Sequence, residues 1–249
     1  MAQLPDWQPL EGGAVPVSEG AGAGRVVAVV ASEGAAGGGW AGAATLEFAR
    51  TWSGRGEKVI LVDGALHSPT LHADAALDNV EGLSDATLFG VSVGRVAHPV
   101  DDGAFFLITA GTAVADANTV ASSPRWSRFL EGFSEAGVTL ILFVRDGDRG
   151  CAAFLGCASD IIVLADQGEG APAAVRDLEG LVRAVTGPRR PWATADEPVR
   201  APSERTEATP GRGRWLWLVI LVVVVAVVLL AVFDIISIPG FPGEASGTG

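Results

Sequence analysis

The chain has 249 residues, which is enough for one domain with appended segments. Its formal net charge of −12 argues against a nucleic-acid partner, because a phosphate backbone binds clusters of Lys and Arg. Cys151 and Cys157, with His67, His72 and His98, show no CxxC or HExxH spacing, so we expect no metal site. We interpret both cysteines as small buried residues of a protein in a reducing compartment.

The first 24 residues are rich in Gly, Ala and acidic side chains and have little apolar periodicity. They lack the basic region and apolar core of a secretory signal peptide. Residues 1–24 are therefore predicted to be a disordered leader.

A strand, a glycine-rich turn and a helix follow at residues 25–31, 32–40 and 41–50. This order is typical of a phosphate-binding loop, in which backbone N–H groups and a helix N-terminus face an anion and a Lys reaches the outer phosphates. In this chain Gly37, Gly38 and Gly39 precede Trp40 at the Lys position and Ala41 at the hydroxyl position. The glycines either form only a tight turn or still wrap an anion, and Trp40 either packs in the site or stacks on a base.

Alternating apolar strands and helices continue from this loop to residue 186. We predict strands at residues 58–62, 105–108, 138–144 and 161–164, and helices at residues 82–89, 122–135, 151–158 and 172–185. This pattern predicts an α/β fold with a doubly wound, mainly parallel sheet over residues 25–186. The functional site of such a fold lies at the carboxyl ends of the strands.

The C-terminal quarter has a different composition. Residues 187–214 form a Pro-, Arg- and Glu-rich linker, and residues 215–233 contain neither a charge nor a helix breaker. Nineteen helical residues span about 28 Å, close to the thickness of a hydrocarbon core, so we predict a transmembrane helix. Arg212 and Arg214 precede it and no basic residue follows, which places the α/β domain in the cytoplasm and the tail 234–249 outside a cytoplasmic (inner) membrane that the chain crosses once.

Four stretches in the α/β region together resemble the bacterial tyrosine kinases of capsule and exopolysaccharide synthesis, a branch of the MinD/ParA-like P-loop ATPases. They are residues 59–63 with 66–72, the Gly-Leu-Ser-Asp turn at 82–85, residues 109–111, and the Ser-Pro-Arg helix start at 122–125. Their shared order and spacing imply a P-loop NTPase-like fold over about residues 25–180. In the family, this fold binds ATP and Mg²⁺.

The departures from the family pattern occur at the positions that bind phosphate and Mg²⁺ in the family. Trp40 and Ala41 replace the phosphate-binding Lys and the Mg²⁺-binding hydroxyl. The second acidic motif keeps Asp63 but has Ala65 for its second Asp and His67 for its Arg.

Further losses lie along the rest of the chain. Val144 stands at the Walker B Asp position, with Asp146 and Asp148 beyond it as potential surrogates. The only Lys, Lys58, opens its strand about 16 Å from the phosphate end and cannot substitute. The chain has no Tyr for a phosphorylated tail, and no final strand for a base pocket is evident after Val185.

These losses lead to the hypothesis of a catalytically inactive, membrane-anchored regulatory or scaffolding module without a cofactor. The resemblance implies work in polysaccharide synthesis or export, with a polysaccharide co-polymerase or an intact kinase as partner. One alternative is a divergent ATPase or kinase that uses ATP, Mg²⁺ and its Asp residues with a Lys or Arg supplied in trans. The others are a nucleotide sensor without hydrolysis and a structural membrane protein of unrelated role.

Overall fold

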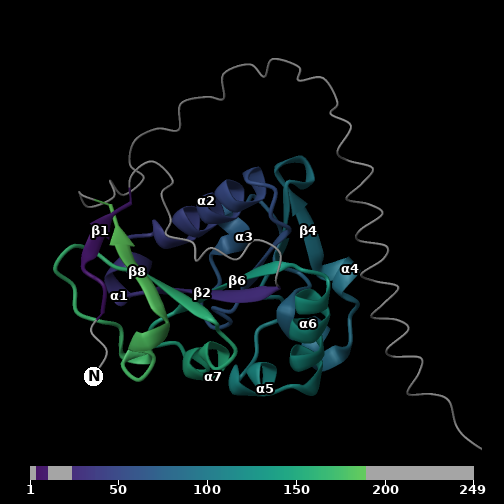
Figure 1. Ribbon diagram of the computed structural model, residues 1–249. Helices are drawn as coiled ribbons and strands as arrows, with labels where there is room; N and C mark the ends of the chain where they lie inside the picture. The colour runs from purple at the N-terminus through teal and green to yellow at the C-terminus, as the bar shows by residue number, and fades with distance from the viewer. Residues whose placement is uncertain (1–3, 11–23, 189–249) are drawn as a thin grey trace, which may run out of the picture.

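A computed structural model describes residues 4–10 and 24–188, which form one eight-stranded sheet between two layers of helices (Figure 1). The strands are β1 (Trp7–Pro9), β2 (Arg25–Ala31), β3 (Val59–Asp63), β4 (Ala97–Val100), β5 (Phe105–Ile108), β6 (Thr139–Arg145), β7 (Asp160–Leu164) and β8 (Val182–Gly187). Their order is β1-β8-β7-β2-β6-β3-β5-β4, and every pair is parallel except β4 with β5. The prediction of a doubly wound, mainly parallel sheet is confirmed.

Helices and short helical turns cover both faces of the sheet. They are α1 (Glu33–Gly37), α2 (Ala41–Gly54), α3 (Leu71–Asp74), η1 (Asp85–Phe89, a π-helix), α4 (Val93–Val96), η2 (Asp101–Gly103), α5 (Asn118–Ala121), α6 (Pro124–Glu135), α7 (Cys151–Leu155), η3 (Ala173–Val175) and η4 (Glu179–Leu181). In Figure 1, α2 and α3 lie on one side of the sheet, and α5, α6 and α7 lie on the other.

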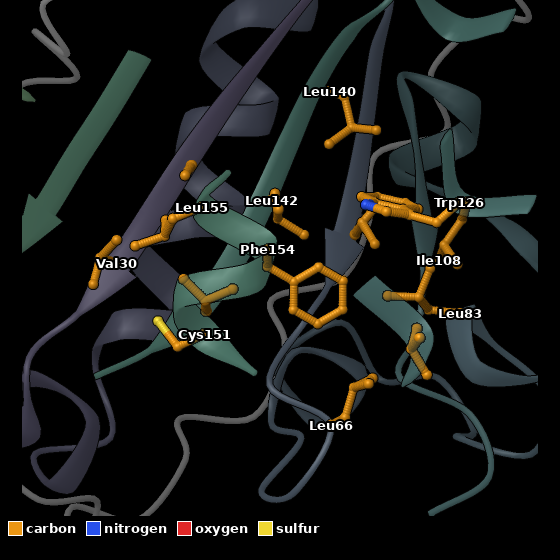
Figure 2. Packing of buried hydrophobic residues seen from close by; sticks show 14 of the residues in the cluster. Val30, Leu66, Leu83, Ile108, Trp126, Leu140, Leu142, Cys151, Phe154 and Leu155 are labelled. Atoms are coloured by element: carbon orange, nitrogen blue, oxygen red, sulfur yellow. The ribbon is translucent and has the colours of Figure 1, made fainter. Parts of the chain in front are cut away.

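Each face of the sheet has its own apolar core. On the α6 side, Trp126 packs edge-on against Phe154 with their ring centroids 5.8 Å apart, and Leu142 of β6 lies close to this pair (Figure 2). On the α2 side, Phe48 and Trp52 are fully buried against the sheet. The central strand β2 is buried along most of its length because both layers cover it.

The C-terminal part of the sheet corrects two predictions. The helix expected at residues 172–185 is wrong, because this stretch forms the turns η3 and η4 and then strand β8. Gly180 interrupts the helical pattern, and the β-branched Val182, Val185 and Thr186 suit a strand that pairs with β7. A final strand after β7 is therefore present, contrary to the expectation from the sequence.

Part of the segment predicted to be a disordered leader is ordered. Trp7–Pro9 forms β1, which pairs with β8, and the Trp7 indole N–H donates to the Ala165 carbonyl at 2.9 Å. Pro9 is tolerated because β1 is an edge strand. Such a short strand has no periodicity to reveal it, so only the pairing with β8 defines it.

Most of the predicted appendages lie outside the described residues. These are the linker after residue 188, the transmembrane segment 215–233 and the tail 234–249. Within residues 4–10 and 24–188, no helix has the length and apolar character needed to cross a membrane.

Candidate functional site

The glycine-rich segment after β2, predicted from the sequence as a turn, begins with a short helix, α1. Ser32 caps this helix, and its Oγ accepts a hydrogen bond from the Ala35 N–H at 3.1 Å. The Gly38 N–H donates to the Gly34 carbonyl at 2.8 Å, and the Gly39 N–H donates to the Ala36 carbonyl at 3.2 Å. Backbone donors that would face a phosphate in an open loop are therefore used inside the segment.

Two of the three glycines, Gly38 and Gly39, are needed for the path of the chain. Gly37 ends α1, Gly38 follows as its C-cap, and Gly39 has a φ of +73°, which favours glycine. A Cβ on Gly38 would lie 3.0 Å from Cδ1 of Trp40, so this position must be small for the indole to pass. The interpretation of the glycines as a tight strand-to-helix turn agrees with these contacts.

Trp40 occupies the interior beneath this turn. Its side chain is 2 % exposed and belongs to the apolar cluster that contains Ala35 and Leu164. The ring reaches the end of β8, where a Cβ on Gly187 would lie 3.3 Å from Cη2 of the indole. Its Nε1 is buried without a hydrogen-bond partner among the described residues. Trp40 is thus a packing residue, and the adjacent Ala41 is equally buried at the start of α2.

A carboxylate from another part of the chain lies at the start of the same segment. Glu169, in the loop after β7, accepts hydrogen bonds from Ser32 Oγ at 2.5 Å and from the N–H groups of Gly34 and Asp166, both at 3.0 Å. Desolvation opposes its charge, yet these hydrogen bonds outweigh that effect and lower the pKa of Glu169. The sequence analysis missed this residue because 135 positions separate it from Gly34.

Asp63 ends β3 in a very different environment. It is fully buried, its Oδ1 accepts the Ala65 N–H at 3.1 Å, and its Oδ2 has no partner among the described residues. Desolvation by burial raises its pKa to about 7, although backbone hydrogen bonds act in the opposite direction. Ala65 is also fully buried, so no polar side chain takes the place of the second acidic residue of the motif.

Val144 in β6 and the two acids that follow the strand, Asp146 and Asp148, have three different environments. Val144 is 1 % exposed and packs in the core on the α6 side. Asp146 caps η3, since its carboxylate accepts the N–H groups of Ala173 and Ala174 at 3.0 Å each. Only Asp148 acts on Asp63, and its charge contributes to the raised pKa there.

Asp148 is itself only partly satisfied. Desolvation raises its pKa, which the charges of Arg145 and His67 partly offset, and its Oδ2 is buried without a partner in the described chain. Among those residues, no group of three or more His, Cys, Asp or Glu side chains is arranged to hold a metal ion. Of the two potential surrogate acids, the structure therefore brings Asp148, and not Asp146, to Asp63.

The surroundings of Lys58, Cys151 and Cys157 suit a structural role for each of them. Lys58 donates to the Ala136 carbonyl at 3.2 Å, at the start of β3 and away from the glycine segment. Burial raises the pKa of Cys151 to about 12 and that of Cys157 to about 11, so both are unreactive thiols near neutral pH.

Two motifs that support the resemblance brace η1. Asp85 of the Gly-Leu-Ser-Asp turn accepts the N–H groups of Gly82 and Thr112 at 2.9 and 3.0 Å. Ser123 and Arg125 of the Ser-Pro-Arg stretch both donate to the Thr87 carbonyl within η1, at 3.2 and 3.4 Å. These motifs define the fold and do not contribute reactive groups.

No protein-family model and no curated protein sequence matches the chain. Solved structures do match. They include the chimerical protein CapA2B2 (TM-score 0.58, 15% identity, covering 67% of this chain and 76% of that one) and the kinase domain of the Escherichia coli tyrosine kinase ETK (0.57, 14%, 76% and 73%). The kinase domain of VpsO also matches (0.55, 16%, 67% and 85%). At these identities the likeness establishes the fold, and it is the fold of the bacterial tyrosine kinase branch indicated by the sequence motifs.

Proposed function

We propose that this chain is a catalytically inactive, membrane-anchored relative of the bacterial tyrosine kinases that works as a regulatory or scaffolding module. The observation that carries this proposal is the closed glycine segment. Gly38 and Gly39 donate inside it, Glu169 takes the Gly34 N–H, and Trp40 fills the interior.

The surrounding residues do not fit ATP with Mg²⁺. A transferable phosphoryl group needs a nearby cation, a metal-binding hydroxyl and open backbone donors. Trp40 supplies no cation and Ala41 supplies no hydroxyl. Hydrogen bonds within the glycine segment already use backbone donors that a phosphate would need. A carboxylate at Glu169 would also repel a phosphate approaching Gly34. We therefore assign no cofactor to the chain.

The cellular setting of the proposal rests on the sequence. The span 215–233, preceded by Arg212 and Arg214, anchors the α/β domain at the cytoplasmic side of the inner membrane. The resemblance to the capsule and exopolysaccharide kinases supports a role for the module in the synthesis or export of a polysaccharide. Its partner is then a polysaccharide co-polymerase or an intact kinase.

The decisive experiment is a titration of the full chain, in mild detergent, with ATP and MgCl₂. Calorimetry and tryptophan fluorescence should both remain flat to millimolar ATP, and hydrolysis should not exceed the blank. Saturable binding without turnover would instead indicate a nucleotide sensor. Mg²⁺-dependent turnover that disappears in Asp63→Ala would indicate a divergent ATPase, with Asp63 and Asp148 as its remaining acids.

A second experiment tests the anchor separately. The full chain should sediment with the inner membrane of the expressing cell and resist extraction by carbonate. A chain that ends at Gly213 should appear in the soluble fraction, provided that its circular dichroism is unchanged. Recovery of the full chain in the soluble fraction would refute the anchor but would leave the assignment of the closed segment intact.

A further inference from the structure

Helix α6 presents a charged outer face that no other part of the described chain covers. Trp126 and Phe133 point into the core, whereas Arg128, Glu131 and Glu135 are exposed. Spacings of three and four residues place these three charges on one side of the helix. None of them forms an ion pair or a hydrogen bond with another described residue.

The order of charge along this face opposes the helix dipole. A helix favours acids near its N-terminus and bases near its C-terminus. α6 has the reverse, with Arg125 and Arg128 in its first half and Glu131 and Glu135 in its second. Since the reversed order is unfavourable in the isolated chain, a partner with the complementary order would compensate for it.

A second copy of α6 has that order when it runs antiparallel. Residues 125 and 135 are equidistant from residue 130, and residues 128 and 131 are equidistant from a point just before it. A two-fold axis on the exposed face of α6, at the level of residues 129–130, therefore sets Arg128 against Glu131 of the other copy, and Arg125 against its Glu135. Such a contact is isologous, so each pair occurs twice.

An exposed aromatic side chain adds apolar area near Arg125, at the N-terminal end of α6. Phe89, at the end of η1, is 69 % exposed. It is held beside Arg125, whose guanidinium donates to the Leu88 carbonyl at 3.1 Å, and a Cβ on Gly90 would lie 3.2 Å from that guanidinium. Aromatic residues and Arg are both enriched in protein interfaces.

We propose that two copies of this chain associate through antiparallel α6 helices, with Arg128–Glu131 pairs at the centre. α6 lies on the opposite side of the sheet from α2, so the contact does not involve the glycine segment and is independent of the proposed function. The contact is mainly electrostatic and should weaken as salt rises.

Charge exchange tests this pairing with internal controls. Sedimentation velocity of the full chain, in detergent at low salt, should show a monomer–dimer equilibrium. Arg128→Glu or Glu131→Arg should each weaken the dimer by about tenfold or more, since both central pairs become like-charged. The double variant Arg128→Glu/Glu131→Arg should dimerise again, and the two single variants should associate with each other when mixed.

Arg55→Glu is the matched control, because Arg55 is exposed at the end of α2 and forms no ion pair with described residues. It should leave the dimer unchanged. Circular dichroism of each variant checks folding. A wild-type chain that stays monomeric at low salt would overturn the proposal. A double variant no tighter than the single variants, with all variants folded, would do the same.

Discussion

Two carboxylates near the carboxyl ends of the strands differ sharply. Glu169, beside the glycine segment, accepts three hydrogen bonds and has a lowered pKa. Asp63, at the end of β3, is fully buried with one oxygen lacking a partner, and its pKa is raised to about 7. The candidate site thus has two halves. In the glycine half, the carboxylate has hydrogen-bond partners within the chain, whereas in the half formed by the ends of β3 and β6 a buried carboxylate oxygen lacks one.

This difference suggests that the two halves have separate stability roles. In the glycine half, Glu169 and Trp40 supply the charge and volume that complete the packing of α1 and the end of β8. In the β3–β6 half, Asp63 and Asp148 remain as buried acids with unsatisfied oxygens, which cost free energy at neutral pH. Substitutions in the first half should therefore destabilise the fold, and neutralising Asp63 should not.

The largest effect should come from Trp40→Ala. Removing a fully buried indole leaves a cavity among α1, α2 and β8, so the free energy of unfolding should fall by about 3–5 kcal/mol. Urea unfolding followed by circular dichroism would measure this loss. Trp40→Phe should cost much less, because it keeps an aromatic ring and removes the unpartnered indole N–H. A loss below about 1 kcal/mol for Trp40→Ala would mean that the indole does not complete the core.

Asp63→Asn should have the next largest effect, which is a change in how the stability of the fold depends on pH. The pKa of Asp63 is above its unfolded value of 3.8, so the folded state retains a proton that the unfolded state releases. Stability should therefore fall between about pH 4 and pH 7 and remain low above that range, by a few kcal/mol at most.

The asparagine variant should lose this dependence and be the more stable protein at pH 8. Urea unfolding at intervals from pH 4 to pH 8 would show the change in slope. Asp78→Asn, at an exposed position, is the matched control and should retain the wild-type slope. If Asp63→Asn also retained that slope, the raised pKa would be refuted.

The sequence predicted the fold well where apolar runs are long. Each of the strands β2, β3, β5, β6 and β7 was predicted from a continuous apolar stretch. The edge strands β1 and β4 were missed, as was β8 next to β1, because pairing with neighbours defines short strands more than their own residues do. The sequence also predicted that Trp40 and Ala41 stand where the similar kinases have a Lys and a hydroxyl.

The side-chain contacts around the glycine segment and beyond β6 could not be predicted from the sequence. The contact of Glu169 with Ser32 joins positions 137 apart and depends on where the loop after β7 folds back. The separate roles of Asp146 and Asp148, two residues apart, follow from the position of η3, which the sequence predicted as part of a helix. Such contacts depend on tertiary structure and leave no local pattern.

Glu169→Gln should destabilise the fold modestly. Glu169 is largely exposed to solvent, so screening limits the loss to about 1 kcal/mol at pH 7. Its pKa is lowered, so its contribution is present above the unfolded pKa near 4.5 and is lost as pH falls below that value.

The difference between wild type and Glu169→Gln should therefore shrink as the pH falls below about 4.5, opposite in direction to the Asp63 effect. Thermal unfolding at pH 7, 5 and 3 would measure it. Asp177→Asn, at an exposed position without a described hydrogen bond, is the control. An equal difference at all three pH values would show that the charge of Glu169 is not responsible.

The smallest effect should come from a helix cap outside the site. Ser123 caps α6 by accepting the Arg125 N–H at 3.2 Å and also donates to the Thr87 carbonyl at 3.2 Å, so Ser123→Ala should cost about 0.5–1 kcal/mol. Ser32 caps α1 in the same way, but its hydroxyl donates to the Glu169 carboxylate at 2.5 Å, and a hydrogen bond to a charged acceptor is the stronger one, so Ser32→Ala should cost more. Ser127→Ala, on the exposed side of α6, should be nearly neutral. If Ser32→Ala cost no more than Ser123→Ala in urea unfolding, the charged acceptor Glu169 would stabilise α1 no more than the neutral Thr87 carbonyl stabilises the start of α6.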